Sequence, residues 1–110
     1  MVTTRYGEKV SGMTAIVVGP NDLSGSMGHM AEPRHPDVVR AIETVIARAR
    51  QTEVFVGIAI GDDPGVLIEW VDKGMQWLLM GTDFSLTLRS ADAVSEQVRN
   101  HIGTTGKKEE

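Results

Sequence analysis

An aspartate that could bind a metal stands in a short polar segment just after an apolar run. The segment reads GPNDLS and covers residues 19–24. A carboxylate beyond the end of a strand can bind a hard divalent cation through oxygen, which makes Asp22 a candidate metal ligand. The backbone N–H groups of Asn21 and Asp22 could also face a substrate carboxylate, if the residues after Pro20 begin a helical turn. The structural alternative is that Asp22 is an N-cap or turn residue, which is a common role for aspartate.

Other polar residues along the chain are weaker candidates for chemistry. His29 and His35 follow in the same segment, and either could be a base or a ligand. Exposure to solvent or helix capping is the commoner role for such histidines. Asp63 before Pro64 is most simply an N-cap, and Asp83 is interpreted in the same way. A phosphate cradle at residues 25–28 is disfavoured, because the spacing of a known phosphate motif is absent.

These residues are positioned by three short apolar runs, at residues 13–19, 54–60 and 76–81. The runs are nearly continuous in hydrophobicity instead of alternating, which is typical of strands buried on both faces of a parallel sheet. Between the first run and the next helical pattern lies a loop of about 16 residues, Pro20 to His35. A loop of that length in a small domain is usually functional or disordered.

A helical pattern follows each run. The first begins at Pro36–Asp37, and its apolar stripe is Val38, Ile42, Val45 and Ala49. The second begins at Asp63–Pro64, ends at Gly74 and directs Leu67, Trp70 and Val71 inward. The third ends at Ile102, after a start near Ser85 or Ser90. The order strand–helix, repeated, predicts an α/β fold with parallel strands and right-handed crossovers.

Composition limits the classes of partner and compartment. The chain has 110 residues, a length that suits one compact domain, and a formal net charge of -4. No broad basic patch is visible, so nucleic acid is not an expected partner. Cysteine is absent, which excludes disulfides and thiolate metal sites. The apolar runs are shorter than the roughly 20 residues that cross a bilayer, and the first residues lack a signal-peptide core. A cytoplasmic protein with no membrane contact is expected.

The stretch GPNDLSGSMGHMAEPRHPDVVRAIE, residues 19–43, resembles a segment of the HpcH/HpaI aldolases. In that family the pattern G-P-x-D-L-S is followed, after a spacer, by H-P and a helix. The likeness continues through GIAI at 57–60 and GTDFSL at 81–86, and it covers about residues 10 to 100. The first pattern is fairly specific, whereas the later ones could be generic features of a barrel.

The resemblance implies a (β/α)8 barrel, of which this chain supplies three consecutive βα units. Residues 1–102 would be the C-terminal part of the barrel, and 103–110 a disordered polar tail. The family's enzymes are metal-dependent carbon–carbon lyases that assemble as oligomers and release pyruvate by retro-aldol cleavage of 2-oxo acids. Asp22 matches a carboxylate ligand of Mg²⁺ or Mn²⁺, with Co²⁺ as another option. The amides of Asn21 and Asp22 match the donors to the pyruvate carboxylate.

The family's remaining site residues have no match in this chain. They are a glutamate ligand, a substrate-binding arginine and a histidine that moves protons, and all would lie before residue 1. We therefore expect the chain alone to be inactive, and to form homo-oligomers or pair with the missing part of the barrel. Two alternatives stay open at this point. One is a non-catalytic binding or assembly module that keeps the fold. The other is an unrelated doubly wound domain with a phosphate near the long loop.

Overall fold

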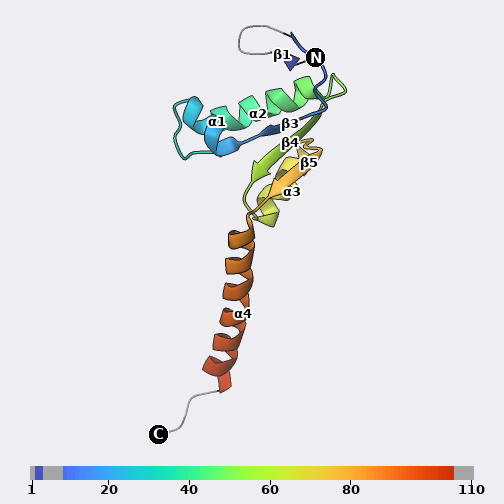
Figure 1. The fold of residues 1–110 in the computed structure, drawn as a ribbon. Helices are drawn as coiled ribbons and strands as arrows, with labels where there is room; N and C mark the ends of the chain where they lie inside the picture. Colours follow the sequence, from blue (N-terminus) through green and yellow to red (C-terminus); the bar gives the residue numbers. More distant parts are fainter. Residues whose placement is uncertain (1, 4–8, 106–110) are drawn as a thin grey trace. The chain divides into compact units, whose positions relative to one another are not determined.

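The computed structural model describes residues 2–3 and 9–105 of the chain. The chain divides into two compact units, Met1–Met80 and Gly81–Glu110. Figure 1 labels the helices and strands in chain order. Their bounds are β1 Val2–Thr3, β2 Lys9–Val10, β3 Ala15–Val18, α1 Pro20–Ser26, α2 Pro36–Ala49, β4 Phe55–Ile60, α3 Pro64–Asp72, β5 Trp77–Met80 and α4 Asp83–Thr105.

The first unit is built on a parallel sheet with the strand order β3-β4-β5. The register places Val17 beside Gly57, and Gly57 beside Trp77. Helix α2 lies in the crossover from β3 to β4, and α3 lies in the crossover from β4 to β5. The predicted α/β class with parallel strands is therefore confirmed. Strands β1 and β2 form a separate antiparallel pair, which the sequence pattern did not predict.

Helix α2 packs on one face of this sheet through the apolar stripe that its sequence predicts. Val38 and Ile42 are fully buried and belong to one cluster with Val56 and Ile58 of the central strand. The stripe continues along the helix through Ile46 and Ala49, while Val45 is only partly buried. Burial of these side chains is the main stabilising term, since each contributes roughly 1.5–3 kcal/mol when removed from water.

Helix α3 packs against the same cluster. The Asp63 carboxylate accepts hydrogen bonds from the first turn of the helix, so the predicted N-cap is confirmed. Trp70 and Leu67 are buried as expected, but Val71 is 49% exposed and its predicted inward orientation is wrong. Gly74 has a φ of 107°, a left-handed conformation that glycine adopts without strain, and it ends the helix where predicted.

The predicted long loop after β3 is wrong in its first half. Residues Pro20–Ser26 form helix α1, which has 7 residues and is too short to show a helical period in the sequence. Beyond it, Gly28 and Ala31 have φ angles of 80° and 59°, so the chain turns there before α2 begins. The carboxyl end of β3 is therefore followed by an ordered helix and a tight turn.

The second unit contains helix α4. Its N-cap is Thr82, whose hydroxyl accepts a bond from Ser85 N–H at 3.2 Å while Ser85 Oγ accepts one from Thr82 N–H at 2.9 Å. Asp83, our expected cap, is instead the first residue of the helix. The helix ends at Thr105, so residues 103–105 of the expected tail are helical, and 106–110 lie outside the described residues. Among the described residues, no helix combines the length and hydrophobicity that crossing a bilayer requires.

The other face of the sheet carries apolar side chains that stay largely in contact with solvent. Val17, Phe55 and Leu79 lie on this face, and 49%, 53% and 58% of their surfaces are exposed. The apolar runs are typical of strands buried on both faces, but within the described residues of the first unit only the face under α2 and α3 is covered. On the uncovered face the Trp77 indole lies against the backbone of Gly57.

Substitution Gly57→Ala tests this packing. A Cβ atom at residue 57 would lie 2.3 Å from the Trp77 ring, so the indole must move. We expect a loss of about 1–3 kcal/mol in the free energy of unfolding, the usual cost of overpacking. Gly61→Ala is the matched control, because a Cβ there meets no atom within 4 Å. Urea unfolding of both variants measures the difference, and equal stability would contradict the described position of Trp77.

Candidate functional site

The Asn21–Asp22 pair lies at the carboxyl end of β3, in the first turn of α1. Gly19 has extended backbone and precedes the helix, and its carbonyl accepts the first helical hydrogen bond, from Leu23 N–H at 2.9 Å. Pro20 has no N–H to donate. The N–H groups of Asn21 and Asp22 therefore precede the hydrogen-bond ladder of the helix, and they are the donors that a helix N-terminus offers to an anion.

The other residues of the GPNDLS segment hold this pair at the surface. Pro20 and Ser24 are buried, and Leu23 packs against the core cluster. Ser24 is fully buried, and its hydroxyl donates to the Asn21 carbonyl at 2.7 Å. Because these three side chains point inward on so short a helix, Asn21 and Asp22 are exposed. The segment thus combines an apolar anchor with a polar outer edge.

The Asp22 carboxylate makes no hydrogen bond or ion pair with the described residues. The N-cap position is held by Gly19, with no side-chain cap. The carboxylate folds back toward Gly19, since a Cβ added there would lie 3.2 Å from Asp22 Oδ2. The structural alternative, in which Asp22 is a cap or turn residue, therefore lacks the hydrogen bond that it requires. An exposed and unengaged carboxylate is available to an external ligand.

A surface cavity of about 270 Å³ lies beside this pair, at the carboxyl ends of β3 and β4. Asn21 lines it, whereas Asp22 is not among the lining residues. Arg34 also lines it, and its guanidinium is bound to Glu69 at 2.8 Å. The remaining lining residues come from the start of α1, the turn before α2, the end of β4, and α3 with the loop before it: Pro20, Pro33, Ala59, Ile60, Gly61, Asp63, Val66 and Trp70.

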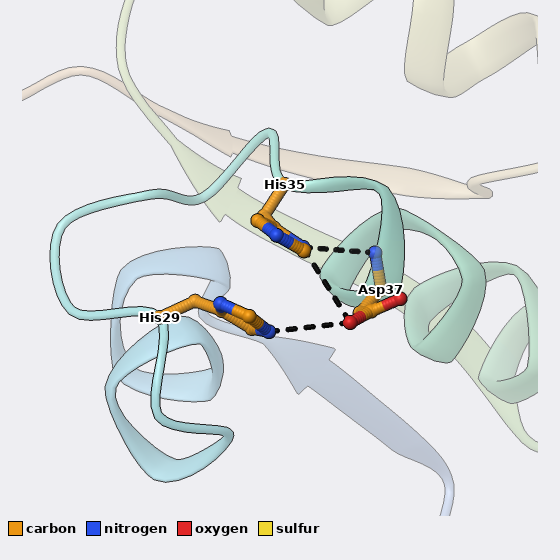
Figure 2. A group of neighbouring side chains, drawn as sticks. All are labelled: His29, His35 and Asp37. Carbon is orange, nitrogen blue, oxygen red and sulfur yellow. Dashed lines mark hydrogen bonds and ion pairs between the residues drawn. The ribbon is translucent and has the colours of Figure 1, made fainter.

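A second polar cluster, formed by His29, His35 and Asp37, lies at the start of α2 (Figure 2). His35 caps the helix, because its Nδ1 accepts a hydrogen bond from Asp37 N–H at 3.1 Å. His29 Nε2 lies 3.3 Å from Asp37 Oδ2, and His35 Nδ1 lies 3.8 Å from the same oxygen. The two imidazole rings are stacked, with centroids 3.5 Å apart and a tilt of 15°. Capping by His35 agrees with its expected role, whereas the pairing with His29 was missed.

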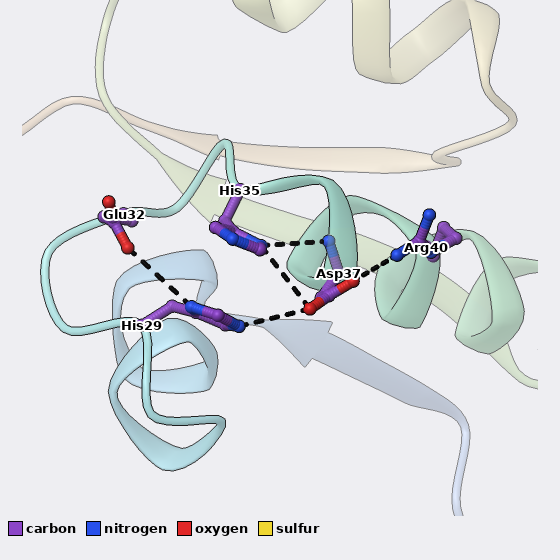
Figure 3. Close-up of polar contacts among 5 residues, drawn as sticks. All are labelled: His29, Glu32, His35, Asp37 and Arg40. Carbon is purple, nitrogen blue, oxygen red and sulfur yellow. Dashed lines mark hydrogen bonds and ion pairs between the residues drawn. The ribbon is translucent and has the colours of Figure 1, made fainter.

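Two charged residues surround this cluster (Figure 3). Arg40 binds Asp37 Oδ1, and Glu32 Oε2 lies 3.7 Å from His29 Nδ1. The Arg40 guanidinium holds the pKa of Asp37 below its ordinary value, with further lowering by His29 and His35. Asp37 is therefore ionised throughout the neutral range. The contact between His29 and Asp37 depends on the turn at Gly28 and Ala31. Residue spacing in the sequence does not reveal the path of that turn, so the contact could not be predicted.

Comparison with known proteins decides the family. Residues 7–93 match the model of the family described as HpcH/HpaI aldolase/citrate lyase. The chain belongs to the HpcH/HpaI family. This confirms the resemblance found at residues 19–43, and the matched range agrees with the expected one.

Individual relatives agree with the family. The chain is 32% identical over 96 residues to a 4-hydroxy-2-oxo-heptane-1,7-dioate aldolase of Klebsiella pneumoniae, covering 87% of this chain and 36% of that protein. It is 37% identical over 81 residues to a hydroxypyruvate/pyruvate aldolase of Pseudomonas aeruginosa, covering 74% and 30%. A solved HpcH/HpaI family protein of Burkholderia cenocepacia aligns with a TM-score of 0.75 and 35% identity, covering 81% and 34%. The chain thus spans about a third of the length of these relatives.

The buried hydroxyl of Ser24 gives a test of how the site is held. Ser24→Ala removes a fully buried donor to the Asn21 carbonyl, and we expect a loss of about 1 kcal/mol in the free energy of unfolding. Ser26→Ala is the matched control, because its hydroxyl makes a similar bond, to Leu23 O at 2.8 Å, at an exposed position. Urea denaturation compares the two. If Ser26→Ala lost as much free energy of unfolding as Ser24→Ala, the burial of the Ser24 hydroxyl would not add to the stability of the site.

Proposed function

We propose that this chain is part of a metal-dependent aldolase, a carbon–carbon lyase that cleaves 2-oxo acids and releases pyruvate. The observation that carries the proposal is the exposed, unengaged Asp22 carboxylate at the carboxyl end of β3, in a chain that belongs to the HpcH/HpaI family. In parallel α/β folds, ligands bind at the carboxyl ends of the strands, which is where this carboxylate lies.

Asp22 fits a hard divalent cation as one member of a larger set of ligands. Mg²⁺ sites usually take one or two carboxylates and complete their coordination with substrate oxygens and water. Oxygen ligands suit Mg²⁺, Mn²⁺ and Co²⁺, so the donor type leaves the choice among them open. When bound, such a cation supplies Lewis-acid polarisation of the substrate keto group. The residues of this chain would hold the cation through Asp22 and leave its other positions to ligands from elsewhere.

The backbone next to Asp22 would orient the substrate. The Asn21 and Asp22 N–H groups precede the helical ladder of α1, so they can donate to the carboxylate of pyruvate or a related 2-oxo acid. This role uses the backbone alone and does not depend on the asparagine side chain. Fixing the carboxylate against two amides would direct the keto oxygen toward the cation at Asp22, which is a positioning contribution to catalysis.

The fold supports a role as one portion of a (β/α)8 barrel. Three parallel strands joined by helices cannot close a barrel, and the face that would point inward is the exposed one, with Val17, Phe55 and Leu79. We propose that this face is covered by further barrel units, on the same polypeptide or on another subunit, in a cytoplasmic oligomer. The exposed apolar side chains also favour the second candidate, a non-catalytic assembly module that keeps the fold without the reaction.

Metal titration and an aldolase assay test the catalytic proposal. We expect the 110-residue chain to bind Mn²⁺ weakly and to have little or no aldolase activity, since Asp22 is the only site carboxylate that the resemblance assigns to it. Asp22→Asn should remove most of the Mn²⁺ binding seen by isothermal titration. Asn21→Ala is the control, and it should leave binding unchanged because the backbone donor is retained.

One result would count against the catalytic proposal, and another would count against the expected incompleteness of the chain. Mn²⁺ binding that survives Asp22→Asn would place the metal elsewhere. Robust turnover of a 2-oxo acid by the chain alone would show that its own residues complete the site, contrary to the expectation that further residues are needed. Weak binding that is lost in Asp22→Asn, without turnover, is the expected outcome.

The uncovered sheet face gives a prediction about association. We expect the chain to self-associate, because the exposed Val17, Phe55 and Leu79 side chains form an apolar surface. Leu79→Lys should shift the chain toward the monomer in size-exclusion chromatography with light scattering. Ala47→Lys adds the same charge at an exposed position of α2 and should have no such effect. A monodisperse monomer for the unmodified chain would contradict the prediction.

A further inference from the structure

We propose that His29, His35 and Asp37 form a second metal site, for Zn²⁺ or another ion that prefers nitrogen ligands, at the start of α2. The site shares no residue with the Asp22 site and does not depend on the proposed aldolase function. Each of the three side chains offers one ligand atom, and these atoms all lie within 4.8 Å of one another. Among the described residues, no other group of histidine and acidic side chains meets this condition.

Two of the three separations between the ligand atoms are close to what tetrahedral zinc requires. With bonds of 2.0–2.1 Å, neighbouring ligand atoms around the ion are separated by about 3.3 Å. His29 Nε2 and Asp37 Oδ2 are 3.3 Å apart, and His35 Nδ1 is 3.8 Å from that oxygen. Asp37 Oδ2 thus lies near a ring nitrogen of each histidine, and an ion bound to this oxygen would be within reach of both. A fourth position remains for water, as in zinc sites with three protein ligands.

Two local adjustments accompany binding. The stacked rings lie in two nearly parallel planes, so an ion cannot lie in the plane of both, and one imidazole must rotate to direct its lone pair at the ion. The side chains of His29 and His35 are 26% and 30% exposed, which leaves room for that rotation. His35 must also release the hydrogen bond that it accepts from Asp37 N–H. These adjustments oppose binding, so we expect a site of moderate affinity.

Residues around the cluster engage the other polar atoms of two of the ligands, His29 and Asp37. A metal-bound histidine generally has a carboxylate or carbonyl near its other ring nitrogen, and its carboxylate partners are themselves hydrogen-bonded. Glu32 lies beside His29 Nδ1 and leaves Nε2 for the ion, while Arg40 binds Asp37 Oδ1 and leaves Oδ2 (Figure 3). The ionised state of Asp37 supplies the negative charge that a divalent ion needs.

Metal preference separates this site from the one at Asp22. Imidazole suits Zn²⁺, Co²⁺ and Ni²⁺, whereas Mg²⁺ and Mn²⁺ favour sites made of oxygen atoms. Binding at the cluster would tie the turn that carries His29 to the first turn of α2. An ion that binds only the folded chain also stabilises it, so thermal stability should rise when Zn²⁺ is added.

Zinc titration of the 110-residue chain tests the proposal, with isothermal titration for affinity and thermal unfolding for stability. His29→Ala should weaken Zn²⁺ binding by at least about tenfold, because one of three ligands is lost. His35→Asn should do the same while preserving the helix start, since asparagine is a good N-cap. His101→Ala removes the one histidine outside the cluster and is the control, for which we expect unchanged binding. Circular dichroism confirms that each variant is folded.

The outcomes separate this inference from the aldolase proposal. Zinc affinity that is equal in the unmodified chain, His29→Ala and His35→Asn would overturn the second site, whatever happens to Mn²⁺ at Asp22. Zinc affinity that falls in His101→Ala and not in the cluster variants would also overturn it. The inference would be supported if His29→Ala, His35→Asn and Asp37→Asn all lose Zn²⁺ binding and the zinc-dependent rise in melting temperature, while His101→Ala keeps both.

Discussion

The contact between α2 and the central strand β4 is the constraint on which the rest of the first unit depends. Val38 and Ile42 pack against Val56 and Ile58, and all four side chains are fully buried. Cores are packed as densely as organic crystals, so this contact leaves α2 few alternative positions on the sheet. Because α2 follows β3 through α1 and a turn, fixing its axis also fixes where that connecting segment must run. Both candidate sites lie on this segment or at its junction with α2.

The connecting segment has to satisfy two requirements at once. Leu23 packs against the core cluster and Ser24 is buried, which keeps α1 against the core and Asp22 at the surface. The turn after α1 then has to reach the start of α2, and left-handed backbone at Gly28 and Ala31 makes that reversal possible. The same reversal brings His29 back to the helix N-terminus, where the His35 cap already holds a ring nitrogen at the first turn. The positions of the Asn21–Asp22 pair and of the histidine cluster therefore both depend on how α1 and α2 pack on the sheet.

The sequence predicted the helices and caps that follow from hydrophobic periodicity or from a particular residue type. It did not predict the contacts that arise where the chain turns back on itself. The stripe of α2, the Asp63 cap and the glycine stop at residue 74 follow from local rules, and all three are observed. Helix α1 was missed because 7 residues give no measurable period. Asp22 was found from a motif, whereas the pairing of His29 with Asp37 depends on a turn whose geometry no spacing rule encodes. The continuous apolar runs indicated strands buried on both faces, but they could not show which neighbouring layers are present, and one face is exposed among the described residues.

The exposed face contains information about the surroundings for which these strands are suited. One face of the sheet is covered by α2 and α3. The other face carries Val17, Phe55 and Leu79, which are about half exposed. A two-layer domain that exposed this face to solvent on its own would carry polar residues there. The Trp77 indole over Gly57 belongs to the same face, and its buried Nε1 has no hydrogen-bond partner among the residues that the structure describes. A buried donor without a partner is costly, so an acceptor supplied from outside the described residues would improve this packing. The face therefore has the character of a surface that is buried against another apolar layer, which agrees with the proposal that further barrel units cover it.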